Sequence, residues 1–345
     1  MLKHDVLKYE VGECREFFSK RDKPPAVSMT CGRFHWEYNQ GMARHNYFNR
    51  QVALPQDHGA WVFILSPLLV GIFAGGTLPY ATLALVAAAM SAFLLRQPLA
   101  VMVKAYAGRR PRADLPAARL WFSVYGVVAL LALAELFYLG EGFIALLAIP
   151  GIPVFAWHLW LVSKRAERRQ AGIEVIATGV LSLAAPAAFW VGRGGYDSAG
   201  WWLWALAWLQ SAASIVYAYL RLGQREGTAV LQSPRRGSGG SSASRDPQSK
   251  DRGEAAPASS QERSGKWQMG RRAFLYTSFD LAATLILGWA KILPQWIFVP
   301  FLLQWAETVW GIERPARGWK PARIGIRQLI VSALWTILFI IVWRL

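Results

Sequence analysis

Long apolar runs separated by short basic loops dominate the chain from residue 59 onward. A helix needs about 20 mostly apolar residues to cross the hydrocarbon core of a bilayer. Runs of about this length predict nine transmembrane helices, at 59–75, 77–95, 119–139, 142–162, 172–192, 200–220, 273–290, 293–311 and 327–344. The pattern therefore predicts an all-α, polytopic membrane bundle.

Prolines interrupt several of these runs. Pro150 and Pro153 fall in the fourth run and Pro186 in the fifth, so both helices should be kinked. Pro98 follows closely on Arg96 at the edge of the second run, which predicts that this helix ends there.

Two polar segments flank or divide the bundle. Residues 1–50 are charged and aperiodic, which predicts a poorly ordered extension. Residues 225–266 are rich in Ser, Gly and Arg and cannot bury much apolar surface, which predicts a disordered cytoplasmic linker. The membrane bundle is thereby divided into residues 51–224 and 267–345.

Basic residues fix the expected orientation. The chain has 38 Lys and Arg against 21 Asp and Glu, for a formal charge of +17. With nine helices and a cytoplasmic N-terminus, 35 of the 38 basic residues lie on the cytoplasmic side. The charge is therefore explained by membrane topology. Nucleic acid is not an expected partner, because no soluble segment is long enough for a nucleic-acid-binding fold.

Polar side chains inside or next to the apolar runs are candidates for function, because they are costly at membrane depth. The predicted topology places them toward the cytoplasmic half, which suggests a polar cavity open to the cytoplasm. The candidates are Asp57 and His58 before the first helix, His158 in the fourth, Tyr217 in the sixth, Asp280 in the seventh, and Gln304 and Glu307 on one face of the eighth.

Each candidate also has a structural explanation. Asp57 is well placed to cap the first helix, and His58 to lie at the membrane interface. His158 suits a structural hydrogen bond. Asp280 and Glu307 could join helices to each other by pairing with a cation or with one another.

The loop after the second helix is the second candidate region. Arg96, Arg110 and Arg112 fall within 17 residues there, and Arg binds phosphate or carboxylate through its planar, bidentate fork. Ordinary positive-inside anchoring explains the same arginines. The sequence contains no Gly-rich phosphate loop, no His/Cys metal cluster and no supported catalytic triad, so it predicts no metal and no cofactor.

The segment Pro55-Gln-Asp-His-Gly-Ala-Trp61, followed by Pro67 and Gly71, resembles the opening of the YwiC-like family of bacterial membrane proteins. Asp57 stands where that family usually has Glu. Phe93-Leu-Leu-Arg-Gln-Pro-Leu99 resembles the family's second block, and the resemblance extends over residues 50–345 apart from the linker. It implies a multi-pass protein of the bacterial cytoplasmic membrane, and it implies no established activity.

The chain is more distantly similar to the UbiA-type intramembrane prenyltransferases. These also have nine helices, and Arg109-Arg-Pro-Arg-Ala-Asp-Leu-Pro116 resembles the stretch after their first Asp-rich motif. Here Asp114 stands alone where two clusters of Asp would be needed to hold Mg²⁺-diphosphate. Ordinary prenyl transfer is therefore not expected, and whether the protein is an enzyme stays open.

These observations favour a protein that binds an amphipathic, anionic ligand, such as a lipid or an isoprenoid-like molecule, in a cytoplasm-facing cavity. Arg96, Arg110 and Arg112 would hold the head and Trp-rich walls would hold the tail. One alternative is a degenerate prenyl or lipid-headgroup transferase. The other is a small-solute or proton-coupled transporter that uses Asp280 and Glu307.

Overall fold

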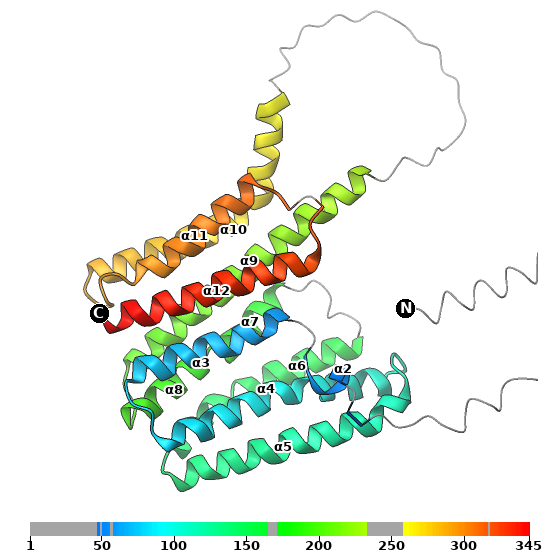
Figure 1. The fold of residues 1–345 in the computed structure, drawn as a ribbon, viewed down its shortest axis with the longest axis vertical. Helices are drawn as coiled ribbons and strands as arrows, with labels where there is room; N and C mark the ends of the chain where they lie inside the picture. Colours follow the sequence, from blue (N-terminus) through cyan, green and yellow to red (C-terminus); the bar gives the residue numbers. More distant parts are fainter. Residues whose placement is uncertain (1–46, 49, 56–57, 165–170, 233–257, 317) are drawn as a thin grey trace, which may run out of the picture. The chain divides into compact units, whose positions relative to one another are not determined.

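The computed structural model describes residues 47–48, 50–55, 58–164, 171–232, 258–316 and 318–345 (Figure 1). Every regular element in these ranges is a helix, and none of the described residues forms a strand. The prediction of an all-α fold is therefore confirmed. Most of the predicted N-terminal extension lies outside the described residues.

The helices follow one another through short connections, and their bounds fall into three groups. The first group is α2 (Arg50–Ala53), the 3-10 turn η1 (His58–Trp61), α3 (Val62–Gly75), α4 (Tyr80–Tyr106), η2 (Arg112–Asp114) and α5 (Leu115–Tyr138). The second is η3 (Gly142–Ala148), α6 (Gly151–Lys164), α7 (Ala171–Leu181) and α8 (Ala184–Arg193). The third is α9 (Ala199–Gln232), α10 (Ala258–Trp289), α11 (Phe298–Glu313) and α12 (Pro321–Arg344).

Six helical segments are long and apolar enough to cross a membrane, and the segment Gly59–Gly75 is apolar but shorter. The six are Tyr80–Tyr106, Arg112–Tyr138, Gly142–Lys164, Ala171–Arg193, Ala199–Arg225 and Ala322–Arg344. The remaining two predicted spans correspond to the second half of α10 and to α11, which pack against each other as a hairpin. The count of nine and the cytoplasmic N-terminus stay predictions.

The outward faces of these helices suit lipid. On α5, Val124, Val127, Val128 and Leu131 are 40%, 54%, 40% and 66% exposed and follow a helical spacing. Such a continuous apolar stripe would be a liability in water, and it is the normal exterior of a helix in hydrocarbon. The structure is therefore that of a membrane protein.

Helix α9 is the element around which the others assemble. It packs against α3, α7, α8, α10, α11 and α12. Its buried Leu203 and Leu206 belong to a core cluster that also contains Phe301 of α11 and Trp335 of α12. The Trp335 ring meets Phe301 edge-on at 5.4 Å, a favoured aromatic geometry.

Helices α3 and α8 are held together by small residues. Gly71 and Gly75, four residues apart on α3, face Ala185 and Gly192 of α8 so closely that a Cβ on either α3 glycine would crowd the α8 backbone. Close backbone approach through residues spaced four apart is a common way for helices to associate in membranes. This contact brings together two helices far apart in the sequence, which lie side by side in Figure 1.

The predicted kinks are confirmed as helix breaks. Pro150 lies between η3 and α6, and the fifth predicted helix is split into α7 and α8 at Ser182 and Leu183, just before Pro186. A proline lacks the N–H that would continue the helical ladder, so each break falls next to one.

Pro98 behaves differently, and the prediction that the second helix ends beside Arg96 is wrong. Helix α4 continues through Pro98 to Tyr106. The lost hydrogen bond is outweighed by packing, because Pro98 is buried and α4 lies along both α5 and α2. Arg96 is therefore a residue within a continuous helix and not part of a loop.

The ends of the predicted linker are also helical. Helix α9 runs on to Gln232, and α10 begins at Ala258. Ala, Leu, Gln, Glu and Arg are frequent in these stretches and favour helix, which explains the extension beyond the apolar core. Only residues 233–257 of the predicted linker lie outside the described residues.

Candidate functional site

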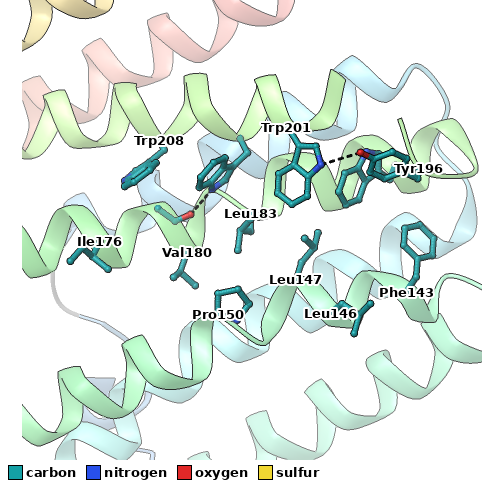
Figure 2. Close-up of a pocket in the computed structure, with 13 residues that line it drawn as sticks. Phe143, Leu146, Leu147, Pro150, Ile176, Val180, Leu183, Tyr196, Trp201 and Trp208 are labelled. Atoms are coloured by element: carbon teal, nitrogen blue, oxygen red, sulfur yellow. Dashed lines mark hydrogen bonds between the residues drawn. The ribbon is translucent and has the colours of Figure 1, made fainter. Parts of the chain in front are cut away.

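The main cavity among the described residues lies between η3, α7, α8 and α9 and has a volume of about 600 Å³ (Figure 2). This falls within the usual range for a small-molecule site. Its walls are almost entirely apolar or aromatic. They are formed by Phe143, Leu146, Leu147, Pro150, Ile176, Gly179, Val180, Leu183, Trp190, Tyr196, Trp201, Trp204 and Trp208.

One wall of this tryptophan cavity is a continuous row of indoles. Trp201, Trp204 and Trp208 are spaced i, i+3, i+7 and therefore share one face of α9. Trp204 stacks on Trp208 with ring centroids 5.2 Å apart, and Trp201 meets Trp204 and Trp190 edge-on at 6.0 and 5.4 Å. Each ring supports the next, so the wall is rigid.

Every indole N–H in the row is paired within the protein. Trp204 Nε1 donates to the carbonyl of Gly179 at 2.9 Å, and Trp208 Nε1 donates to the carbonyl of Val175 at 2.8 Å. Trp201 Nε1 donates to the hydroxyl of Tyr196 at 3.3 Å, and Trp190 Nε1 donates to a backbone carbonyl at 2.6 Å. The rings therefore present their carbon surface to the cavity, as the close-up shows.

The break between α7 and α8 helps to build this wall. Gly179 lies in the last turn of α7, where backbone carbonyls lack helical donors, and the indole of Trp204 supplies one. Gly179 also leaves room for the neighbouring ring, since a Cβ there would lie 2.8 Å from Trp208. The cavity can therefore accept an apolar chain but offers few polar partners.

A separate polar region lies between α9, α11 and α12. Glu307 of α11 accepts hydrogen bonds from Arg327 Nε at 2.6 Å and Arg327 Nη2 at 2.7 Å, a bidentate ion pair. Its Oε1 also accepts from the Tyr217 hydroxyl of α9 at 2.6 Å. The Arg327 guanidinium lies 3.5 Å from the centre of the Trp310 ring. Glu307 is thus fully paired, with a cation as one of its partners.

Gln304 lies one turn from Glu307 and belongs to the same region. Its Nε2 donates to the carbonyl of Gln210 at 3.1 Å and to the hydroxyl of Ser214 at 3.3 Å. Three of the predicted candidates, Tyr217, Gln304 and Glu307, therefore come together in one small pocket.

Asp280 of α10 is 2% exposed, and neither of its carboxylate oxygens has a donor among the described residues. Two contacts set the register of the α10–α11 hairpin. Trp305 Nε1 donates to Ser278 Oγ at 3.0 Å, and Gly270 abuts Ile312. This register puts Asp280 at about the same level as Gln304 along the hairpin. Asp280 faces the protein interior and not lipid.

The arginines predicted to hold an anionic head lie elsewhere. Arg110 pairs with Asp114 at 2.7 Å, Arg112 is exposed in η2, and the Arg96 guanidinium lies 5.3 Å from the centre of the Phe93 ring. None of the three lines the tryptophan cavity. Arg109, next to them, donates to the carbonyl of Val162, which ties this loop to the end of α6.

The remaining candidates contribute less. Asp57 lies outside the described residues, and of His58 only the backbone, at the start of η1, is described. His158 lies in α6, is partly exposed and lines neither cavity. Their roles stay predictions.

The sequence reasoning missed one residue. Arg221 looked like one of many linker arginines, yet it is 1% exposed, and its Nη1 donates to the carbonyls of Gly311 at 2.8 Å and Arg314 at 2.7 Å. It thereby satisfies carbonyls at the end of α11, where a positive charge is favourable. A signal was available, because Gln210, Ser214, Tyr217 and Arg221 form a polar stripe on an otherwise apolar helix.

Comparison with known proteins identifies part of the chain. Residues 54–189, from the end of α2 almost to the end of α8, match the model of the YwiC-like protein family. The resemblance to that family is confirmed over this range, which is shorter than the predicted range of 50–345. No curated protein and no solved structure matches the chain. The similarity to the UbiA-type enzymes stays a prediction.

Proposed function

We propose that this membrane protein, YwiC-like over residues 54–189, binds an amphipathic, anionic lipid or isoprenoid-like molecule whose apolar chain occupies the tryptophan cavity. We further propose that it does so in the cytoplasmic membrane of a bacterium. The observation that carries the proposal is the chemistry of the cavity, which combines a volume of about 600 Å³ with an almost wholly apolar lining.

The pairing of the indole N–H groups supports an apolar occupant. A ligand rich in hydrogen-bonding groups would be desolvated in this cavity without finding partners, which is unfavourable. An acyl or isoprenoid chain loses nothing of this kind and gains contact with a preformed aromatic wall. The fixed rings also reduce the ordering cost of binding.

The basic loop between α4 and η2 supplies the proposed site for the head. Arg109 ties this loop to Val162 near the end of α6, and the other end of α6 begins next to Pro150, a residue of the cavity wall. The helical rise gives a separation of about 18 Å along α6 between Val162 and Pro150. A long chain can span this distance, with its anionic head at Arg96 and Arg112.

The first test measures lipid retention. The protein is purified in mild detergent, and bound lipids are extracted and quantified by mass spectrometry. Replacing both Trp204 and Trp208 with Ala should remove most of a specific bound lipid. The control is Trp289→Ala, because that indole is 87% exposed and outside the cavity. Equal retention by all three proteins, or retention of bulk membrane lipids only, would overturn the proposal.

The second test locates the head. The double variant Arg96→Gln, Arg112→Gln should lower retention of the anionic lipid while leaving a neutral analogue unaffected. The matched control is Arg193→Gln, an exposed arginine three residues beyond Trp190 at the other end of the cavity. A loss confined to Arg193→Gln would put the head at that end and reject the assignment to Arg96 and Arg112.

Asp280 favours a second candidate function, proton-coupled transport of a small solute. A carboxyl that is buried in a membrane helix without a described partner is typical of a proton-carrying group. Solute-driven proton uptake into proteoliposomes that disappears in Asp280→Asn would support this function. Uptake that is equal in liposomes without protein would reject it.

A further inference from the structure

A second, much smaller space lies between α9, α11 and α12. Its volume is about 10 Å³, and it is lined by Ser214, Tyr217, Gln304, Glu307, Thr308, Gln328 and Val331. A space of this size is close to the minimum that holds one water molecule. None of its residues lines the tryptophan cavity, and the proposed lipid ligand makes no use of it.

Two side-chain amides in this space have a fixed orientation. Gln304 Nε2 donates to the backbone carbonyl of Gln210 at 3.1 Å, and Gln328 Nε2 donates to the backbone carbonyl of Ser214 at 3.0 Å. A carbonyl oxygen only accepts, so the amide nitrogen must face it in both cases. The two amide oxygens are therefore the groups that remain.

Both of these oxygens are buried and lack a donor among the described residues. Gln304 is 6% exposed, so solvent does not reach it from outside. Leaving a buried acceptor unsatisfied costs about 1–3 kcal/mol, and two in one space are unfavourable unless something donates to both.

The other hydroxyls and charges of the pocket show which donor fits. Tyr217 and Thr308 spend their hydroxyl hydrogens on Glu307 and on the carbonyl of Gln304. The Glu307 carboxylate is neutralised by Arg327, so the pocket holds no net charge that would select a cation. Ser214 Oγ accepts from Gln210 Nε2 at 3.2 Å and from Gln304 Nε2 at 3.3 Å, and it still has one hydrogen to donate.

We propose that this space is a binding site for one water molecule. The water donates to Gln304 Oε1 and to Gln328 Oε1 and accepts from the Ser214 hydroxyl. Three hydrogen bonds are the usual number for a buried water. Because its partners belong to three helices, the water joins α9, α11 and α12 next to the ion pair of Glu307 and Arg327.

The test is a structure of the detergent-purified protein by cryo-electron microscopy at a resolution that reveals ordered water. We expect a single peak within about 3 Å of both amide oxygens and of Ser214 Oγ. Absence of the peak, with both oxygens paired to protein donors, would overturn the proposal. Ligand distances near 2.4 Å would also overturn it, because they indicate a metal ion such as Ca²⁺.

A variant provides the second measurement. Gln328→Met keeps the length of the side chain and removes one acceptor, so the peak should vanish while Gln304 and Ser214 stay in place. Gln295→Met, at an exposed position outside the pocket, should leave the peak unchanged. If Gln328→Met does not fold, the wild-type density alone decides the question. A peak that persists in folded Gln328→Met would contradict the proposed bridge.

Discussion

The tryptophan cavity and the polar pocket are built on two different faces of the same helix, α9. On one face, Trp204 and Trp208 have their only polar groups paired with α7, and a large space remains that is apolar. On the other face, Gln210 and Ser214 lie in a dense hydrogen-bonded network around a space of about 10 Å³. The comparison teaches that the size of a cavity and its chemistry are set separately, by packing and by which donors are already used.

The largest expected effect is on the polar face. Arg221→Met removes the guanidinium that bonds the carbonyls of Gly311 and Arg314 and leaves them buried without that donor. The free energy of unfolding should fall by about 3 kcal/mol, since buried bonds to charged groups are costly to lose. Thermal unfolding in detergent measures the loss. Arg323→Met is the control, because Arg323 is exposed, and an equal effect of both variants would contradict this role of Arg221.

A somewhat smaller effect is expected from Glu307→Gln. The change removes the charge that pairs with Arg327 and keeps the shape of the side chain. Because Arg327 is one-third exposed, water compensates part of the loss, and the expected destabilisation is about 1–2 kcal/mol. The comparison variant is Glu313→Gln, on an exposed residue of the same helix. Lipid retention should be unchanged in both, and a large loss in Glu307→Gln would link the two faces.

On the apolar face, Gly179→Ala should act by filling space. The new Cβ would lie 2.8 Å from Trp208, so the ring must move and the cavity narrows. We expect a destabilisation of about 1–2 kcal/mol, typical of overpacking, together with reduced lipid retention. Gly172→Ala on the same helix has open space around it and should be neutral or slightly stabilising. Parallel behaviour of the two variants would argue against a tightly packed wall.

The smallest effect is expected from Trp204→Phe. The aromatic surface is largely kept, and only the hydrogen bond to the carbonyl of Gly179 is lost. Stability should fall by about 1 kcal/mol, and lipid retention should stay close to that of the wild type. If retention falls as far as in the Trp204→Ala, Trp208→Ala variant, the indole N–H would have to contact the ligand directly.

The sequence predicted much of the fold, because apolar length and proline position are local properties. The helix breaks at Pro150 and before Pro186 followed from the chemistry of proline alone. The passage of α4 through Pro98 did not, since it depends on the packing of neighbouring helices.

The site was harder to predict. The spacing of Trp201, Trp204 and Trp208 indicated a common face, but the opposing wall comes from η3 and α7, and a single sequence does not reveal that contact. Glu307 was expected to pair with a cation or with Asp280. That Arg327 is the cation depends on the register of α11 and α12, which is a long-range property.

The contact between Gly71 and Ala185 has a consequence for synthesis. The two residues are separated by roughly 110 positions, and at about 5–20 residues per second the ribosome needs on the order of 5–20 s to make the intervening chain. During that interval the glycine face of α3 has no partner in its own chain. A nascent protein therefore spends its first seconds with its tightest helix contact unmade, and a second copy of α3 nearby is the natural competitor for that face.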